Sequence, residues 1–397
     1  MRSPHTIGRE EMEKLQYKIL AVIFVVALVV FAAVTDYNYI SYYVNDVVYN
    51  EKWVPDLGRK NETDYMSCFF GKEVLIDLNG GVQRLMGTPE MNEVVRLQNG
   101  HLTGMKVAIA ENRLIEEADD ITYLYHYLKE RGIPFLYVAA PDKIAKHDKE
   151  LPIGYADSTN ENLDIFLEEL KRQGVPYIDM RDEFFDVGMD QYDYFFLTDH
   201  HWTMEGGFYA YTKIAEWLQE NAGLTIDPML TDISNYSFTH YDNAIVGSWG
   251  QRTGKLFSGT EGIDILSPEF HTALTRTSDG AQGTYDEVLV RADIIEENHP
   301  QHIYDLVFGY SYSGFTNQET ESDARILMAC DSFGKVVNPF LILSVKQFDV
   351  IESYYPEHLN KEYIEGVHPD AIILMQCPAN NLGVDSSYTY ELNLSAE

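Results

Sequence analysis

Two segments of the sequence place reactive polar side chains beside apolar runs. Residues 195–203 read Phe-Phe-Leu-Thr-Asp-His-His-Trp-Thr, and residues 329–334 read Ala-Cys-Asp-Ser-Phe-Gly. Ser332 stands where an apolar run ends and a helical pattern begins, so backbone N–H groups there could stabilise an oxyanion. A hydroxyl is a weak nucleophile at neutral pH and needs a base. His201 can be that base and Asp199 can fix its tautomer, so we predict a catalytic triad of these three residues.

Each segment also has a plainer interpretation. Ser332 alone could be the N-cap of a helix, and the segment from Asp199 to His201 could be a solvated loop or part of a metal site. An Asp-His-His triplet also marks a family of metal phosphoesterases, but those enzymes need further aspartates on preceding strands to hold two metals. The preceding strands here end near Asp142 and Asp179, without the expected acidic pairs. We therefore expect neither a metal nor a cofactor.

The chain around these segments alternates between helices and short apolar strands. Continuous apolar runs bounded by turn signals predict buried strands at 134–140, 176–179, 325–330, 348–352 and 371–377. Apolar residues at helical spacing predict helices at about 112–131, 161–173, 204–220, 334–345 and 358–366, with Thr203 as an N-cap. This order implies an α/β fold with a mostly parallel sheet covered on both faces. Active-site loops then lie beyond the carboxyl ends of the strands.

The remaining regions flank or interrupt this pattern. Residues 36–110 have mixed polarity and turn signals, and we expect a stalk and lead-in there. The catalytic domain is expected at 111–385, and a C-terminal tail at 386–397. Residues 222–324 are less regular and rich in Gly, Ser, Thr and Asp, which indicates an insertion of short strands and loops.

An apolar segment near the N-terminus predicts one transmembrane helix. Residues 19–34 contain no charged or strongly polar side chain, and flanking tyrosines can extend this run as an interfacial belt across a core of about 30 Å. Basic residues precede the run, so the positive-inside rule places residues 1–18 in the cytoplasm, the span at 19–35, and the rest outside the cell membrane. A cleaved signal peptide is the alternative, although the run is long for one and no clean Ala-x-Ala site follows.

Composition and cysteine usage exclude some classes of function. The chain has 397 residues, with Lys+Arg 29 against Asp+Glu 63 and a formal net charge of −34. A field of that sign repels phosphate backbones, so we expect no nucleic-acid partner. The cysteines Cys68, Cys330 and Cys377 have no zinc-site spacing. Cys330 and Cys377 each end an apolar run and could be neighbours in the sheet, and we expect buried free thiols rather than a disulfide.

The motifs resemble those of the alginate O-acetyltransferase-like branch of the SGNH hydrolases. They are most similar to the bacterial proteins named for an Asp-His-His-Trp (DHHW) motif, present here at 199–202. That family pairs an Asp-x-His element with a later Gly-Asp-Ser-like block, which Asp331 and Ser332 match, with Cys330 in place of Gly. Further segments also look like the family, at 140–143, 247–254 and 369–373. The resemblance covers roughly residues 60–385 and implies a three-layer, SGNH-hydrolase-like fold.

The resemblance also implies an activity and a cellular setting. It implies a membrane-anchored, extracytoplasmic O-acetyltransferase that acts on a cell-surface or secreted glycan, with a membrane-bound O-acyltransferase as the acetyl supplier. A glycan O-acetyl esterase is an alternative, because the motif does not decide between transfer to a sugar and transfer to water. A non-catalytic glycan-binding or assembly protein with the same fold is a further alternative.

Five residues are candidates for oxyanion or substrate contacts. Gly250 and either Asn380 or Asn381 could supply oxyanion donors. Arg252 could bind a carboxylate or a sugar hydroxyl, or form a surface ion pair. Trp202 could be a stacking platform for a sugar ring, although a role in shaping the loop is the plainer reading.

Overall fold

The computed structural model describes residues 4–44, 65, 67–297, 304–308, 313–353 and 359–383. Contacts divide the chain into two units, Met1–Asn79 and Gly80–Glu397. The predicted tail at 386–397 lies outside the described residues, as does the part of the predicted stalk at 45–64. The two units are described separately below.

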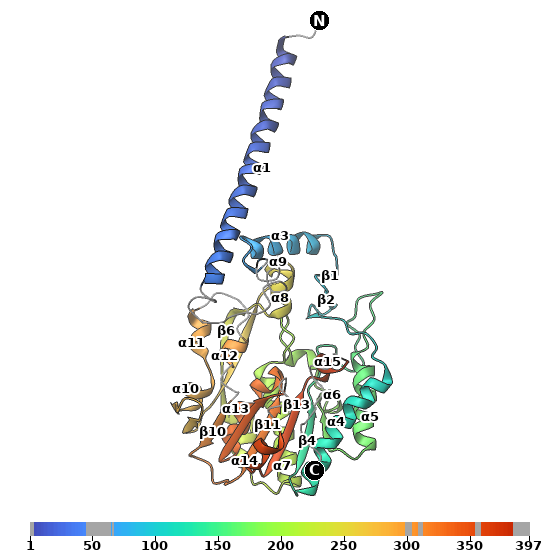
Figure 1. The fold of residues 1–397 in the computed structure, drawn as a ribbon, viewed down its shortest axis with the longest axis vertical. Coiled ribbons are helices and arrows are strands. Elements are labelled where there is room, and N and C mark those ends of the chain that lie inside the picture. Colours follow the sequence, from blue (N-terminus) through green and yellow to red (C-terminus); the bar gives the residue numbers. More distant parts are fainter. Residues whose placement is uncertain are drawn as a thin grey trace. The chain divides into compact units, whose positions relative to one another are not determined.

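The first unit is dominated by helix α1 (Pro4–Val44), drawn in dark blue in Figure 1. Within the described part of the chain, its segment Leu15–Tyr42 is the one helix long and apolar enough to cross a membrane. This segment of 28 residues is longer than the predicted span at 19–35 because the helix continues through the tyrosines that follow the apolar run. Helix α3 (Lys72–Leu85) begins in this unit and crosses the division at Asn79.

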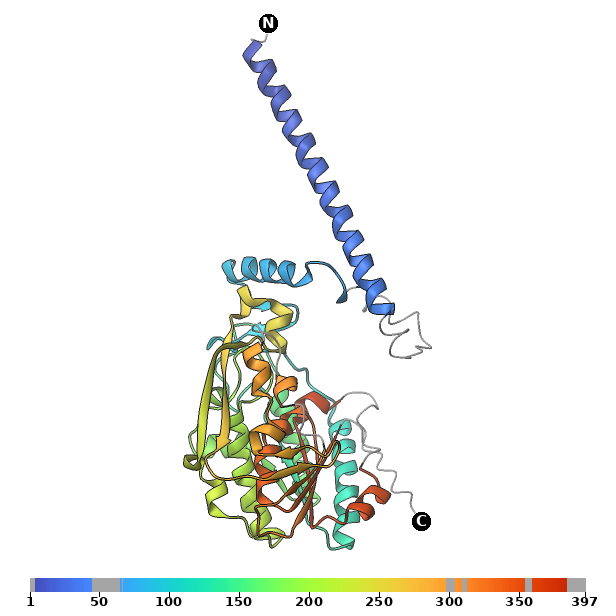
Figure 2. The ribbon, with the colours of Figure 1, turned by 90° about the vertical axis from the view of Figure 1, so that its left-hand side faces the viewer.

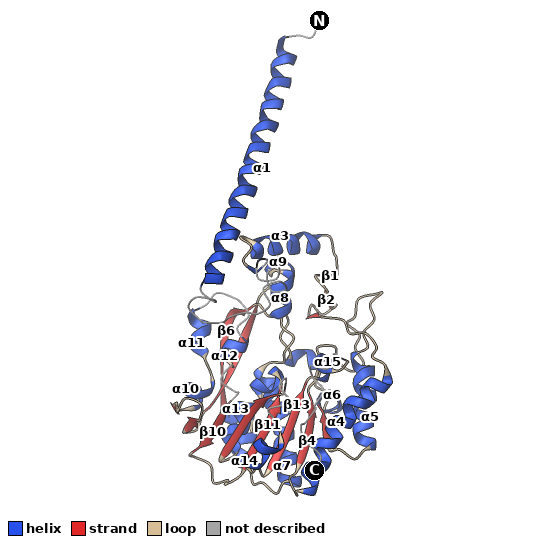
Figure 3. Cartoon of the chain, viewed as in Figure 1, coloured by secondary structure: helices blue, strands red, loops and turns tan. Residues whose placement is uncertain are grey.

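The second unit is built on an eight-stranded sheet, shown in red in Figure 3. In sheet order its strands are β5 (Tyr177–Asp179), β4 (Phe135–Ala139), β13 (Ala371–Gln376), β11 (Arg325–Cys330), β12 (Gln347–Glu352), β10 (Gly314–Asn317), β8 (Leu274–Arg276) and β9 (Gln282–Gly283). The first five are parallel and are the five predicted strands, each within one residue of its predicted ends. The fold is therefore α/β with a mostly parallel central region, as predicted.

Helices cover both faces of this sheet because alternate strand residues point to opposite sides. In β4, Phe135, Tyr137 and Ala139 join one core, whereas Leu136 and Val138 join the other. The first core is closed by α4 (Glu111–Glu130), α5 (Thr159–Arg172) and α14 (Lys361–Val367), and the second by α7 (Met204–Asn221) and α13 (Asn338–Ser344). Figure 2 shows α4 in teal and α7 in light green on opposite sides of the strands, which makes three layers.

The insertion at 222–324 contributes more to the sheet than the sequence predicts. Strand β10 pairs antiparallel with β12, and β8 and β9 continue outward from it as further antiparallel strands. A separate antiparallel hairpin is formed by β6 (Tyr236–Ile245) and β7 (Glu261–Pro268). Short helices complete the insertion: α8 (Ser248–Thr253), α9 (Lys255–Ser258), α10 (Tyr285–Leu289), α11 (Ala292–Glu297) and α12 (Tyr304–Val307).

Other local differences have simple causes. The helix predicted at 334–345 is divided into a 3₁₀ helix, Ser332–Val336, and α13, whose first turn contains Pro339. Helix α6 (Met180–Asp186) was not predicted and is capped by the Asp179 side chain. The Thr203 cap of α7 is confirmed, since its side chain accepts from the Gly206 N–H. Within the lead-in region, strands β1 (Glu90–Met91), β2 (Val94–Arg96) and β3 (Leu102–Thr103) form a small antiparallel sheet of the second unit.

The buried cysteines lie at the ends of two adjacent parallel strands. Cys330 ends β11, and Cys377 directly follows its neighbour β13. Both are buried free thiols, as expected. The last described helix, α15 (Pro378–Asn381), follows at this edge of the sheet.

Candidate active site

The structure brings the three predicted triad residues into one hydrogen-bonded chain. Ser332 follows the carboxyl end of β11, and Asp199 and His201 lie on the loop before α7. The Nε2 atom of His201 is 2.6 Å from the Ser332 Oγ atom, although 131 positions separate the two residues. The Nδ1 atom of His201 is 2.6 Å from Oδ1 of Asp199. With Nδ1 donating to the carboxylate, Nε2 carries the lone pair that can accept the serine proton.

The carboxylate of Asp199 is fully buried and fixed by several donors. Besides the imidazole contact, its Oδ1 atom accepts the backbone N–H of His201 at 3.0 Å, and its Oδ2 atom accepts the N–H of Ser248 at 2.6 Å. Burial alone would raise the pKa of Asp199. The charge and hydrogen bond of His201, with help from His200 and Ser248, instead hold that pKa well below its usual value. Asp199 is therefore ionised and can stabilise an imidazolium.

Aromatic rings fix the orientation of the His201 imidazole. The ring of Tyr304 stacks on it with centroids 3.9 Å apart and planes 6° from parallel. The Tyr304 hydroxyl donates to the backbone carbonyl of Ser332 at 3.0 Å, so one side chain contacts both the base and the nucleophile's backbone. The ring of Phe333 lies 5.1 Å from the imidazole on a tilted plane. His201 is buried apart from its approach to the serine.

Two charged side chains hold the backbone of the loop that carries Asp199. Glu261, at the start of β7, accepts the N–H of Leu197 at 2.5 Å and both the N–H and the hydroxyl of Thr198, at 2.7 and 2.5 Å. Lys143, in the loop after β4, donates to the carbonyls of Phe196 and Asp199. The loop is thus held through its N–H groups on one side and its carbonyls on the other.

Lys143 is fully buried, and burial lowers the pKa of its ammonium group to about 8. Carboxylates at Glu261, Asp199 and Asp142 oppose that shift and favour the protonated form. A protonated Lys143 completes the hydrogen bonds of two buried carbonyls, which would otherwise be costly to leave unpaired. Its position therefore depends on charges contributed by three separate segments.

The segment at 247–254 packs directly on the catalytic loop. Gly247 is required there, because a Cβ atom at this position would lie 2.3 Å from the Cβ of Asp199. The next residue, Ser248, donates its N–H to Asp199 and places its hydroxyl 2.7 Å from Nδ1 of His200. His200 therefore lies beside the triad without contacting the Ser332 hydroxyl in the interactions described.

The turn that presents Ser332 is fixed by the buried carboxyl group of Asp331. Its Oδ1 atom accepts the N–H of Phe333 at 3.0 Å, and its Oδ2 atom accepts the N–H of Cys377 at 2.6 Å. Burial raises the pKa of Asp331 to about 6, against the opposing effect of these N–H donors. The amide of Ser332 itself makes no hydrogen bond to any described residue, so it can meet a carbonyl oxygen.

Two of the predicted oxyanion or substrate residues have other partners. The N–H of Gly250 donates to the carbonyl of Thr198 at 2.9 Å, so it is not available as an oxyanion donor. The guanidinium of Arg252 pairs with Glu93 at 3.0 Å and contacts the carbonyl of Asn92 at 3.0 Å, on an exposed part of the surface. The surface ion pair, one of the two roles considered for Arg252, is the one observed.

The other three candidates contact other groups or line a cavity. Trp202 is fully buried and donates from Nε1 to the carbonyl of Phe333 at 2.9 Å, which leaves no ring face for a sugar. Its role is to tie the catalytic loop to the serine turn. The side-chain oxygen of Asn380 accepts from Lys106 at 3.3 Å. Asn381 lines a small cavity of about 20 Å³ between α4, α5 and the end of β13.

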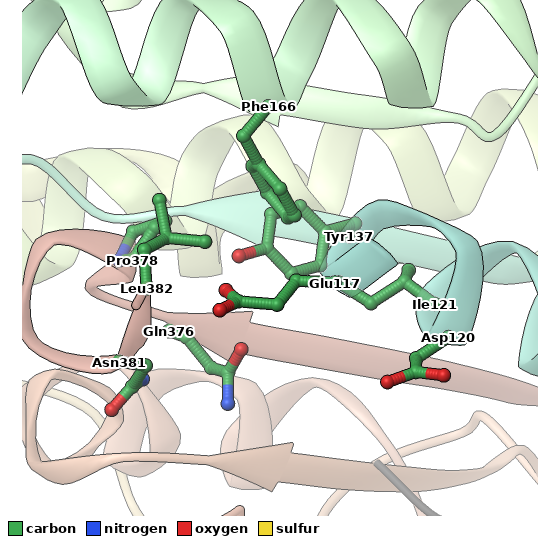
Figure 4. A pocket seen from close by; sticks show the side chains of 9 residues that line it. All are labelled: Glu117, Asp120, Ile121, Tyr137, Phe166, Gln376, Pro378, Asn381 and Leu382. Atoms are coloured by element: carbon green, nitrogen blue, oxygen red, sulfur yellow. The ribbon is translucent and has the colours of Figure 1, made fainter. Parts of the chain in front are cut away.

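Figure 4 shows that Asn381, Gln376 and Glu117 line this cavity together with the apolar Pro378 and Leu382. The Asn381 amide and the Nε2 atom of Gln376 are buried and unpaired there, with Glu117 nearby. A volume of about 20 Å³ suits a single water molecule that bonds these groups. The cavity is therefore a structural feature behind the sheet and gives Asn381 a role other than oxyanion binding.

Asp199, His200 and His201 also form a group of ligand atoms within 4.8 Å of one another. Each of these side chains already has a partner: both oxygens of Asp199 accept N–H groups, and His201 connects the carboxylate to the serine. The charge of this loop is balanced by hydrogen bonds and by Lys143. The donor arrangement is that of a serine–histidine–carboxylate site rather than of a cation cage.

Several residues of the site were not identified from the sequence. Lys143 and Ser248 lie in segments that resemble the family, at 140–143 and 247–254, but no role was assigned to them. Glu261 and Tyr304 lie in the irregular insertion, where no local pattern distinguishes them from surface residues. Their roles arise from the packing of the insertion against the catalytic loop.

Comparisons with known proteins agree with this fold. Residues 104–233 match the family model of the SGNH hydrolase-like domain of the acetyltransferase AlgX. PatB1 from Bacillus cereus, solved with a sulfonyl adduct, has a TM-score of 0.60 and 19% identity, covering 76% of this chain and 98% of that chain. A DHHW family protein from Eubacterium siraeum has a TM-score of 0.55 and 16% identity, covering 78% of this chain and 98% of that one. These structures share the fold. No curated protein matches the chain.

Proposed function

We propose that this chain, whose residues 104–233 match the SGNH hydrolase-like domain of the acetyltransferase AlgX, is a membrane-anchored, extracytoplasmic serine enzyme that transfers acetyl groups to hydroxyls of a glycan. The observation that carries the proposal is the pair of 2.6 Å contacts that join Ser332, His201 and Asp199. Nucleophile, base and orienting carboxylate then stand in the order that acyl transfer requires.

The first half-reaction acylates the serine. His201 takes the proton from Ser332 through Nε2 as the Oγ atom attacks the carbonyl carbon of an acetyl donor. The oxygen of the tetrahedral intermediate faces the amide of Ser332, which supports its negative charge. As the intermediate collapses, the bond to the leaving oxygen breaks and His201 returns the proton to that oxygen. Ser332 is left as an acetyl ester.

The second half-reaction returns the enzyme to its starting state. A sugar hydroxyl gives its proton to His201 and attacks the acetyl carbonyl, and the Oγ atom of Ser332 leaves with the proton from His201. Asp199 stays ionised throughout and stabilises the imidazolium in both halves. The match to the acetyltransferase AlgX supports transfer to a sugar hydroxyl over hydrolysis.

The setting of the reaction follows from the apolar helix. We assign Leu15–Tyr42 as an uncleaved anchor with the second unit outside the cell membrane, which places the enzyme beside cell-surface or secreted glycans. An acetyl donor made in the cytoplasm must cross the bilayer. A membrane-bound O-acyltransferase is the kind of partner that would supply it.

The test replaces Ser332 with Ala in the full chain. Release of acetate from a chromogenic acetate ester should be lost, whereas Ser278→Ala, an exposed serine, should keep it. NMR of surface glycans from cells that carry Ser332→Ala should then show less O-acetyl. A gain in O-acetyl would identify an esterase instead, and undiminished ester turnover would remove Ser332 from the mechanism.

A further inference from the structure

Helix α3 carries a continuous apolar stripe that faces solvent. Val74, Leu75, Leu78, Val82 and Leu85 are between 49% and 90% exposed. At 100° per residue these five side chains fall within about 100° of the helix circumference, which is the width of an amphipathic face. Met86 extends the stripe just beyond the helix and is also exposed. Scattered exposed apolar residues are ordinary, but a contiguous stripe marks an interaction surface.

The opposite face of α3 is already packed. A Cβ atom at Gly80 would lie 2.2 Å from the carbonyl oxygen of Thr253, so only glycine permits this approach to α8. Arg84 donates to the carbonyl of Phe257 in α9 at 3.0 Å. These contacts fix the rotation of the helix about its axis. The apolar stripe therefore cannot turn inward without breaking them.

The start of α3 is held at the end of the apolar run of α1. The ring of Phe70 lies 5.4 Å from the ring of Phe31, and the ring of Phe69 lies 6.5 Å from it. The N–H of Phe70 donates to the Thr35 hydroxyl at 3.1 Å. The apolar run of α1 ends at Val34, and the tyrosines that follow it are expected in the interfacial region. The chain thus enters α3 at the level where the proposed anchor leaves the hydrocarbon core.

From these observations we propose that α3 is an interfacial helix whose apolar stripe lies in the headgroup–acyl boundary of the outer leaflet. The proposal rests on the anchoring of α1 given above. An amphipathic helix of this kind binds through its apolar area, and tethering by α1 raises the effective concentration of bilayer around it. The chain has a net charge of −34, so the attraction is apolar rather than electrostatic.

This surface is connected to the active site through the elements that α3 contacts. Helix α8, which Gly80 approaches, begins at Ser248, and the N–H of Ser248 holds Asp199. On the face opposite the stripe, α3 therefore contacts the end of α8, the helix whose first residue donates to the triad carboxylate.

The test uses spin labels in the full chain, reconstituted in neutral phosphatidylcholine liposomes. With Cys68 changed to Ser, and with Cys330 and Cys377 buried, single cysteines are placed at Leu78 and Val82. Ile153→Cys, also a solvent-exposed apolar position, is the matched control. Labels at 78 and 82 should be more accessible to oxygen than to a water-soluble nickel chelate, and the label at 153 should show the reverse. High salt should not change the result.

A label at Val26 in α1 separates the two proposals. If the label at 26 is more accessible to oxygen, but the labels at 78 and 82 are more accessible to the nickel chelate, the interfacial helix is overturned and the anchor stands. Aqueous accessibility at all three would overturn both. Line broadening at 78 and 82 that disappears on dilution with unlabelled chain would show that a second copy covers the stripe, and would also overturn the proposal. Leu75→Ser/Leu78→Ser should remove the bilayer accessibility of the label at Val82→Cys, while ester turnover in detergent stays unchanged.

Discussion

Replacing Glu261 with Gln should weaken both the fold and catalysis, although Glu261 does not touch the triad. Its two oxygens accept three hydrogen bonds from Leu197 and Thr198. The glutamine side chain keeps one oxygen to accept from Thr198, but its NH₂ group then faces the N–H of Leu197, which loses its acceptor. The change also removes a carboxylate that faces Lys143. Because three hydrogen bonds to a charged acceptor are disturbed at a partly buried site, we expect a loss of about 2–4 kcal/mol in the free energy of unfolding.

The catalytic effect follows from the position of the loop. Relaxation of Leu197 and Thr198 moves the adjoining Asp199, and a displacement of about 1 Å can lower kcat about 100-fold. The KM for a small acetate ester should change little. Urea unfolding measures the stability, and steady-state turnover of the chromogenic ester measures kcat and KM. The control is Glu365→Gln, at an exposed position of α14, which should change the unfolding free energy by less than about 0.5 kcal/mol.

One outcome would refute this reasoning. If Glu261→Gln unfolds at the same urea concentration as the parent and retains its kcat, the loop does not depend on this carboxylate. A loss of stability with full kcat in the folded protein would separate the two effects and show that Glu261 supports the fold without positioning Asp199.

Three further predictions concern the triad and its supports. Asp199→Asn should lower kcat about 10⁴-fold at neutral pH, because an amide favours the His201 tautomer that cannot accept the serine proton, and ester kinetics will measure it. The pKa of Asp331 is raised to about 6 in the fold, so its contribution to stability is fully present below about pH 4. About 3 kcal/mol of that contribution is lost as the pH rises through 6. The difference in unfolding free energy between the parent and Asp331→Ala, measured from pH 4 to 7, should therefore fall with pH, and a constant difference would contradict the prediction. Trp202→Phe should lower the free energy of unfolding by about 2–4 kcal/mol, because it opens a cavity and leaves the Phe333 carbonyl unpaired. In the fraction of this variant that stays folded, the KM for a glycan acceptor should be unchanged; a raised KM would show that Trp202 stacks on the sugar.

The central part of the fold was predictable because its strands are buried on both faces. Strands such as β11 and β13 are continuous apolar runs, which the sequence shows directly. The outer strands are not of this kind: β8 reads Leu-Thr-Arg and β10 reads Gly-Phe-Thr-Asn. They become strands because β10 pairs with the edge of β12 and β8 pairs with β10, a condition that no local pattern expresses.

The site, like the fold, has a part that local sequence shows and a part that only tertiary contacts determine. Asp199, His201 and Ser332 carry recognisable chemistry at recognisable positions, and the structure brings them together. Gly250 was chosen as an oxyanion donor, but its N–H donates to Thr198, and Trp202 was chosen as a stacking platform, but its ring is fully buried. Whether an N–H group is available depends on which carbonyl packs against it, and this is a property of the tertiary structure.

The supports of the loop illustrate the limit most clearly. Glu261 is separated from Thr198 by 63 positions, and Lys143 from Asp199 by 56. Neither sequence separation matches the period of a helix or a strand. In a chain with 63 acidic residues, the sequence alone does not distinguish one functional glutamate from the others. Their importance arises because a buried loop must satisfy its N–H and carbonyl groups from whatever segments surround it.

Labelling by a fluorophosphonate probe tests the central claim most directly, because the probe reacts only with a hydroxyl that a neighbouring base activates. Peptide mass spectrometry of the folded full chain should locate one adduct, at Ser332, and the adduct should disappear in His201→Ala. An unlabelled Ser332 in folded protein, or equal labelling without the imidazole, would contradict the account.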